Sequence, residues 1–189
     1  MATQLIFTYP GLKRAFEQAI ETIEGYREID PAAFYLKLNE ETWSFMEVCQ
    51  HLIQFNRLYL RQMEKAILKT DEKPKCNNTF TLRWIYKKMV SWIEPPVKMK
   101  IKTLSPMYPA KSGTSEENVI DKLIETNKQV LDLLNIAEDE QWDLNEIKGR
   151  NPVIKLTKMT LTEFIVYMEA HQRRHFQQIE NILGVMGGK

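Results

Sequence analysis

The sequence is poor in cysteine and has no long apolar run, and each shortage excludes a class of protein. Its 189 residues include only two cysteines, Cys49 and Cys76, too few for a disulfide framework. No apolar stretch approaches the roughly 18 residues that a membrane-spanning helix needs. Residues 1–10 lack the basic and apolar regions of a signal peptide. We therefore expect a reduced, cytoplasmic location and no membrane partner.

The sequence also lacks an excess of charge of either sign. Its 26 basic and 25 acidic residues give a formal net charge of +1. Proteins that bind nucleic acid usually carry a strongly basic surface, so we do not expect nucleic acid as a partner. The short basic run Lys98, Lys100 and Lys102 is the feature that favours such a partner, but a lysine run in a loop is usually just solvated.

What the sequence does contain is helical periodicity. Apolar residues recur at intervals of three or four in four long segments, a spacing typical of one face of an α-helix. These segments are residues 12–28, 44–68, 115–134 and 160–183. A shorter helix is expected within residues 81–93, and no segment has a convincing strand pattern. We predict an all-α four-helix bundle, a single domain over residues 1–189 with a disordered tail at about 184–189.

Two of the helix starts carry a specific signal. Ser44 with Glu47, and Thr160 with Glu163, match the capping box, in which each residue satisfies a backbone N–H of the other. Ser115 is a candidate cap for the third long helix.

Long loops connect the second helix to the third and the third to the fourth. Residues 95–113 are rich in proline and are expected to be extended. A loop of this length in a compact domain is usually functional or packed over something. Residues 135–159 form a second irregular stretch with a turn at 149–152.

The chain has only three histidines, and all of them lie in helical segments. His171 and His175 are four residues apart on the face that carries Phe164 and Met168. Side chains four residues apart on a helix lie one turn above each other, so both imidazoles can bind one ion. His51 flanks the apolar stripe of the second helix and can also face the interior. Three inward-facing histidines are what a three-ligand metal site needs.

Three neutral imidazoles suit zinc, nickel, iron or copper better than magnesium or calcium. Three protein ligands leave a position for water or substrate, which is typical of a catalytic site. Glu47 and Glu169 are candidate acceptors for an imidazole N–H, although a surface carboxylate without that role is the alternative. The zinc-protease motif is not met, because Gln172 stands where it requires glutamate. The other alternative is that the histidines bond to buried polar groups and hold no ion.

Two motifs resemble those of the DinB-like superfamily, which includes YfiT-type metal-dependent hydrolases. The first is Trp43-Ser44, then Glu47-Val48 and His51-Leu52. The second is Thr160-Leu161-Thr162-Glu163-Phe164, then His171-Gln172-Arg173-Arg174-His175 and Gln178-Ile179. The resemblance covers nearly the whole chain. It implies a DinB-like four-helix bundle in an up-down-down-up arrangement, with a nickel, zinc or iron ion bound by His51, His171 and His175.

The resemblance also implies an activity. Relatives include transferases that use bacillithiol or mycothiol, and isomerases that use mycothiol, and many members form dimers. We therefore expect a metal-dependent thiol S-transferase or hydrolase, in which the ion activates a thiol or water to attack a small-molecule electrophile. Bacillithiol is a candidate cofactor, and a homodimer is expected through the apolar stripes of helices 12–28 and 115–134. The alternative is a non-catalytic metal-binding bundle acting in stress response or as an interaction module.

Two positions depart from the family pattern. Gln172 stands where relatives often carry glutamate between the paired histidines. Asn151-Pro152 stands where many relatives have a His-Pro pair. Neither change removes an expected metal ligand.

Overall fold

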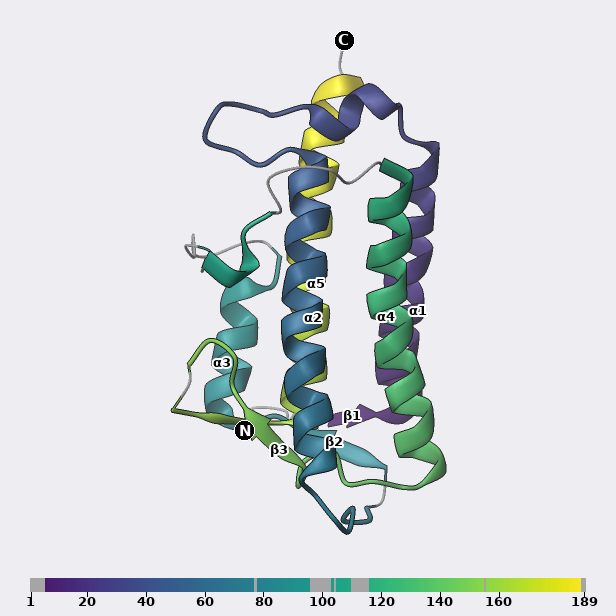
Figure 1. The fold of residues 1–189 in the computed structure, drawn as a ribbon, viewed down its shortest axis with the longest axis vertical. Coiled ribbons are helices and arrows are strands. Elements are labelled where there is room, and N and C mark those ends of the chain that lie inside the picture. The colour runs from purple at the N-terminus through teal and green to yellow at the C-terminus, as the bar shows by residue number, and fades with distance from the viewer. Residues whose placement is uncertain are drawn as a thin grey trace.

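Four long helices form the body of the molecule in the computed structural model, which describes residues 6–76, 78–95, 103, 105–109, 116–154 and 156–187. They are α1 (Tyr9–Gly25), α2 (Phe45–Leu68), α4 (Glu116–Asp139) and α5 (Leu161–Gly187). From the end at which α1 begins, α1 runs up, α2 and α4 run down, and α5 runs up again (Figure 1). Both α1 and α2 pack against α4 and α5. The predicted all-α bundle in an up-down-down-up arrangement is confirmed.

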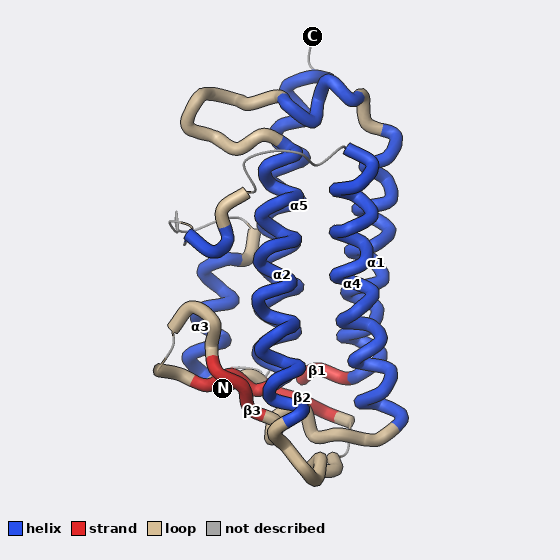
Figure 2. Tube along the Cα trace, viewed as in Figure 1, coloured by secondary structure: helices blue, strands red, loops and turns tan. Residues whose placement is uncertain are grey.

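Shorter elements close one end and one side of the bundle. They are β1 (Ile6–Thr8), β2 (Thr79–Thr81), β3 (Lys148–Arg150), β4 (Lys158–Thr160), α3 (Trp84–Ile93) and the 3-10 helices η1 (Tyr26–Glu28), η2 (Pro31–Tyr35) and η3 (Ser105–Met107). β1 pairs with β2 and β3 with β4, both antiparallel and both at the same end of the bundle (Figure 2). The prediction of no strands is therefore wrong. Strands of three residues are too short to show an alternating pattern.

The two predicted capping boxes are both present. The Ser44 hydroxyl accepts from the Glu47 N–H, and the Glu47 carboxylate accepts from the Ser44 N–H. Thr160 and Glu163 exchange the same two bonds at the start of α5. Ser115, the third candidate cap, lies outside the described residues.

Other boundaries differ from the prediction. α1 begins at Tyr9 rather than residue 12, since Thr8 caps it and Pro10 fits the first turn, where an N–H has no helical partner. α4 continues past residue 134 to Asp139, burying Ala137. α5 runs through Gly184 to Gly187, so the first part of the predicted tail is helical. The predicted turn at 149–152 begins instead with strand residues, because Gly149 belongs to β3.

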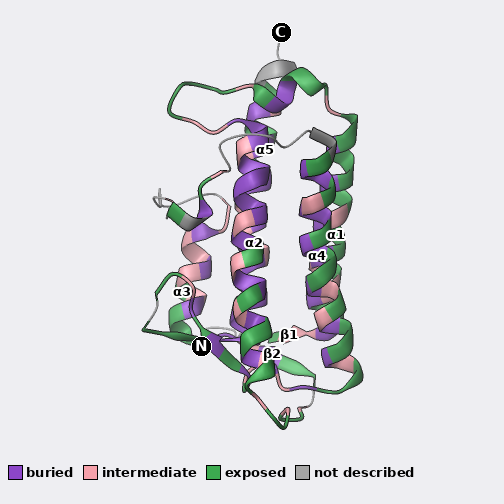
Figure 3. Ribbon diagram, viewed as in Figure 1, coloured by how far each residue is buried: buried purple, intermediate pink, exposed green. Residues whose placement is uncertain are grey.

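The interior consists of two apolar clusters stacked along the bundle. One includes Tyr59 and Phe164 near the small sheets, and the other includes Phe45 near the opposite end. Where one cluster gives way to the other on α2, α4 and α5, four buried side chains form what we call the polar layer: Asn56, Thr126, Asn127 and Gln172. Buried residues dominate α2 and α5, while exposed residues line the outer faces of α1 and α4 (Figure 3).

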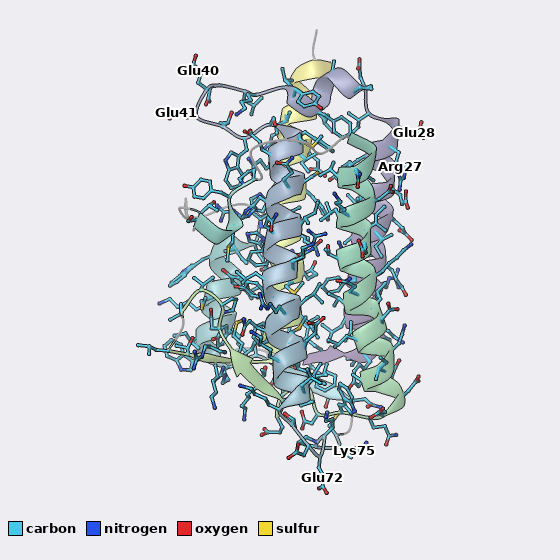
Figure 4. The ribbon with its side chains drawn as sticks, viewed as in Figure 1. Arg27, Glu28, Glu40, Glu41, Glu72 and Lys75 are labelled. Atoms are coloured by element: carbon cyan, nitrogen blue, oxygen red, sulfur yellow. The ribbon has the colours of Figure 1, made fainter. Side chains whose placement is uncertain are left out.

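Charged side chains project from the ends and loops of the bundle (Figure 4). Those labelled there are Arg27, Glu28, Glu40, Glu41, Glu72 and Lys75. The basic run at Lys98, Lys100 and Lys102 falls outside the described residues. Among the helices that the structure describes, none is both long and apolar enough to cross a membrane.

Candidate metal centre

The three histidines, far apart in sequence, lie together in the structure. His51 comes from α2, and His171 and His175 come from α5, which packs against α2. One ring nitrogen from each lies within 4.8 Å of the others. The Nε2 atoms of His51 and His171 are 3.4 Å apart. We call these three residues the histidine cluster.

The histidine cluster forms part of the wall of a cavity of about 210 Å³. The lining residues are His51, Phe55, Tyr59, Ile93, Thr103, Met107, Val153, Tyr167, His171, Arg174 and His175. They come from α2, α5, the end of α3, Thr103, η3 and the segment after β3. α3 and η3 lie on the side of α2 away from α1 and α4 (Figure 1). Each long loop thus contributes to the cavity wall, as expected of loops that pack over something. The described residues of the first loop are 95, 103 and 105–109, of which Thr103 and Met107 line the cavity, and the second loop contributes Val153.

Hydrogen bonds fix the ring orientation of two histidines. His51 Nδ1 donates to the Met107 carbonyl oxygen at 2.7 Å, and His175 Nδ1 donates to Gln178 Oε1 at 2.9 Å. An imidazole that carries its proton on Nδ1 presents a lone pair on Nε2, the state that a metal ligand requires. Both rings are therefore oriented as metal-binding histidines usually are.

The position of His171 tests whether the cluster fits an ion. In a tetrahedral zinc site with Zn–N distances of about 2.1 Å, neighbouring ligand atoms are about 3.4 Å apart. The distance between the Nε2 atoms of His51 and His171 is 3.4 Å. The buried His171 Nδ1 has no hydrogen-bond partner among the described residues, with or without an ion, so the fit rests on the spacing and the donor set. The donor set and spacing fit a metal ion that prefers nitrogen ligands.

Burial keeps all three imidazoles neutral. It lowers the pKa of His175 to about 3, with the nearby His51 adding to the effect. Burial also lowers the pKa of His171 well below its ordinary value, reinforced by His175 and His51. For His51, burial lowers the pKa and the Met107 carbonyl opposes part of that change. Neutral rings are the form that binds a metal, so little proton competition is expected near neutral pH.

Aromatic rings hold the histidine cluster in place. The Phe55 ring stacks on His171 with centroids 3.8 Å apart and planes inclined by 12°. Trp43 lies over His51 at 4.8 Å and stacks on His175 at 6.3 Å. These contacts restrict imidazole rotation. Their roles were not predicted, although Phe55 stands one helical turn after His51 and could have been suspected from that spacing.

Neither predicted carboxylate contacts the histidine cluster. Glu47 is held by its capping box and by an ion pair with Lys37. Glu169 pairs with Arg173. Instead, the acceptors are the Met107 carbonyl and the Gln178 side chain. The sequence does not indicate which backbone carbonyl will accept a hydrogen bond from a histidine. Gln178, in contrast, stands three residues after His175 on the same helix, so its contact could have been predicted from that spacing.

The two departures from the family pattern lie outside the cavity lining. Gln172 is buried in the polar layer, where its Oε1 lies 3.5 Å from Asn56 Nδ2. Asn151 is buried, and its side-chain oxygen accepts from the N–H groups of Val153 and Ile154. It therefore shapes the turn that carries Val153 to the cavity.

Comparison with known proteins gives one family and one fold. A sequence model described as DinB superfamily matches residues 13–179. Among solved structures, YfiT from Bacillus subtilis matches with a TM-score of 0.59 and 15% sequence identity, covering 96% of this chain and 89% of that chain. YfiT is described as "a probable metal-dependent hydrolase with an unusual four-helix bundle topology". No curated protein matches the chain significantly.

Proposed function

The chain belongs to the DinB superfamily, and on that premise we propose that it is a metal-dependent enzyme whose ion is bound by His51, His171 and His175. One observation carries the proposal. Two Nε2 atoms face each other at 3.4 Å, and the Met107 carbonyl fixes the proton of one ring on its other nitrogen. Nickel, zinc and iron all accept such a donor set.

When bound, a divalent ion would lower the pKa of a coordinated water or thiol and so supply a nucleophile near neutral pH. The chain contributes the surroundings. Three imidazoles leave coordination positions for small molecules, and they border the cavity. Phe55, Ile93 and Met107 make part of its wall apolar, which limits water around a bound substrate. Trp43 and Phe55 keep the imidazoles from turning away.

Two reactions suit this arrangement. In hydrolysis, water adds to an acyl or related centre, and the leaving group departs with a proton. In thiol transfer, a thiol loses its proton, a carbon–sulfur bond forms, and the leaving group departs as an anion. The description of YfiT supports hydrolysis, but at 15% identity that likeness shows only the fold. A low-molecular-weight thiol such as bacillithiol therefore stays part of the proposal, with a small electrophile as substrate.

The test has two stages. Protein produced without a histidine tag is first analysed for nickel, zinc and iron. We expect about one ion per chain. Metal-loaded and metal-free protein are then compared on chromogenic esters, and on a generic electrophile in the presence of several thiols. Turnover that requires the ion supports the enzyme. One ion per chain without turnover in any assay would favour the non-catalytic metal-binding bundle, and absence of an ion would contradict the proposal.

A further inference from the structure

We infer that the cavity contains a second subsite, in which Arg174 binds a carboxylate on the substrate, assisted by the hydroxyl groups of Tyr59 and Tyr167. This inference rests on the proposed function, because it concerns what occupies the cavity beside the histidine cluster. It names the class of substrate: a small molecule with an apolar body and a negatively charged group.

The first observation is an arginine at the cavity wall that has no partner among the described residues. Arg174 is half-buried and lines the cavity. Within the described part of the chain, its guanidinium makes no ion pair and no hydrogen bond. The neighbouring Arg173 is different, because it points to the surface and pairs with Glu169 and Glu94. A partly dehydrated charge without a counter-charge is costly, so a position like that of Arg174 favours an anionic ligand.

The second observation is that Arg174 and the histidine cluster share one cavity. Arg174 stands next to His175 on α5 and lines the same cavity as His51, His171 and His175. A positive charge in this largely apolar cavity disfavours another positive charge there, including that of a divalent ion. A carboxylate on Arg174 would remove this repulsion. Metal and carboxylate should then strengthen each other's binding by the same factor.

The third observation concerns the two tyrosines. Tyr59 and Tyr167 both line the cavity, with rings stacked at 5.9 Å. Neither hydroxyl has a hydrogen-bond partner among the residues that the structure describes. Burial raises the pKa of both phenols, so each stays neutral and can donate its proton to an anionic oxygen. Two potential donors and one cation thus belong to side chains that line the same cavity.

The single positive charge of the subsite favours a carboxylate over a phosphate as its ligand. Among the described residues that line the cavity, Arg174 is the only arginine or lysine. One guanidinium balances one negative charge, and its planar fork matches the two oxygens of a carboxylate. A phosphate monoester carries close to two charges at neutral pH and would leave one of them unbalanced in a largely apolar cavity. We therefore assign the subsite to a monocarboxylate with an apolar body.

The test uses benzoate and benzamide, two probes of similar shape that differ in charge. Binding of each to the metal-free, full-length protein is followed by NMR or calorimetry. For wild type we expect benzoate to bind roughly tenfold or more tightly than benzamide, the range expected for a charged hydrogen-bonded pair. Arg174→Gln should remove that preference. Arg173→Gln, the matched control on the surface, should keep it, and Tyr167→Phe should reduce it.

A second arm measures zinc affinity in the presence and absence of benzoate. Benzoate should raise the zinc affinity of wild type several-fold and leave that of Arg174→Gln unchanged. If wild type shows the benzoate preference but binds no zinc, the proposed function fails while the carboxylate subsite stands. If zinc binds but wild type shows no benzoate preference, or Arg174→Gln keeps it, the carboxylate inference is overturned. Circular dichroism checks whether each variant folds. If Arg174→Gln unfolds, Arg174→Lys replaces it in the test. Arg174→Lys keeps the charge and is expected to retain part of the preference for benzoate.

Discussion

At the scale of single residues, the candidate metal centre depends on where each ring keeps its proton. The Met107 carbonyl and Gln178 hold a proton on the outer nitrogen of His51 and His175. The inner nitrogens can then act only as acceptors, and they lie within a few ångströms of His171. One proton on His171 Nε2 can satisfy only one of these acceptors, whereas a cation can bind all three rings at once.

Removal of one α5 imidazole should therefore abolish metal binding. We expect His171→Ala and His175→Ala each to lose stoichiometric nickel, zinc or iron, because two ligands hold an ion poorly in an open site. Metal content after dialysis is the measurement. Gln177→Ala, an exposed position on the same helix, is the control and should keep its ion. A full complement of metal in either histidine variant would exclude that residue as a ligand.

The lowered pKa values predict how the stability of the metal-free protein depends on pH. In the unfolded chain a histidine takes up a proton near pH 6.5, whereas folded His175 does so only near pH 3. Between these values the unfolded state binds more protons, so stability must rise with pH across that window and fall on acidification. Each such histidine contributes a slope of up to about 1.4 kcal/mol per pH unit.

Urea unfolding at several pH values from 4 to 7 measures that slope. His175→Phe keeps an aromatic ring without a titrating nitrogen and should show a smaller loss of stability on acidification. An equal dependence on pH in both proteins would mean that His175 titrates alike in the folded and unfolded states.

At the scale of elements, the polar layer joins α2, α4 and α5 behind the histidine cluster. Asn56 Nδ2 donates to Thr126 Oγ1 at 3.0 Å, a good hydrogen bond. Its contact with Gln172 Oε1 is long, at 3.5 Å, and Gln172 Nε2 is buried with no partner among the described residues. The two contacts of Asn56 should therefore differ in their contribution to stability.

We expect Gln172→Met to be neutral or to stabilise the protein by about 1 kcal/mol, because it removes an unsatisfied buried amide at similar volume. Thr126→Val, the matched variant, should destabilise by about 1–2 kcal/mol, since it removes the good acceptor of Asn56. Chemical denaturation of both variants gives the comparison. Greater destabilisation by Gln172→Met than by Thr126→Val would show that Gln172 has a stronger bond than its geometry indicates.

Some features of the fold could be predicted from the sequence and others could not. The difference is whether the contacts that form them are local or join distant parts of the chain. The starts of α2 and α5 could be predicted because Ser44–Glu47 and Thr160–Glu163 are local pairs. The histidine cluster could be anticipated because helical spacing fixes the face of each residue. The pairing of β1 with β2, and the contact of Met107 with His51, join segments far apart in sequence. Such contacts depend on the closed fold, and no local pattern encodes them.

At the scale of the whole molecule, the expected homodimer needs a different surface from the one predicted. The apolar stripes of helices 12–28 and 115–134 motivated that expectation. In the structure their main residues, among them Phe16, Ile23 and Leu123, are buried inside one chain. They are therefore not free to contact a second copy.

Exposed apolar side chains occur instead on α3 and on the segment between β3 and β4. They are Trp84, Ile85, Val153, Ile154 and Leu156, with Trp84 72% and Leu156 100% exposed. The two segments adjoin each other, because Arg83 and Tyr86 both donate to the Lys158 carbonyl. Five exposed apolar side chains on two adjoining segments make this surface the candidate contact.

We therefore predict that the protein is a dimer and that this surface forms the contact. A two-fold interface would bring the same surface of each chain together, so a single charged substitution acts twice. Trp84→Glu and Leu156→Glu should each lower the fraction of dimer in light scattering at micromolar concentration, with no loss of helical circular dichroism. Leu68→Glu, an exposed apolar position at the end of α2, is the control and should leave the mass unchanged. A monomeric mass for wild type would refute the dimer, whereas a dimer that tolerates both substitutions would place the interface elsewhere.

Because Val153 belongs to this surface and also lines the cavity, a contact here would link association to the shape of the site. Loss of the dimer should then weaken benzoate binding as well.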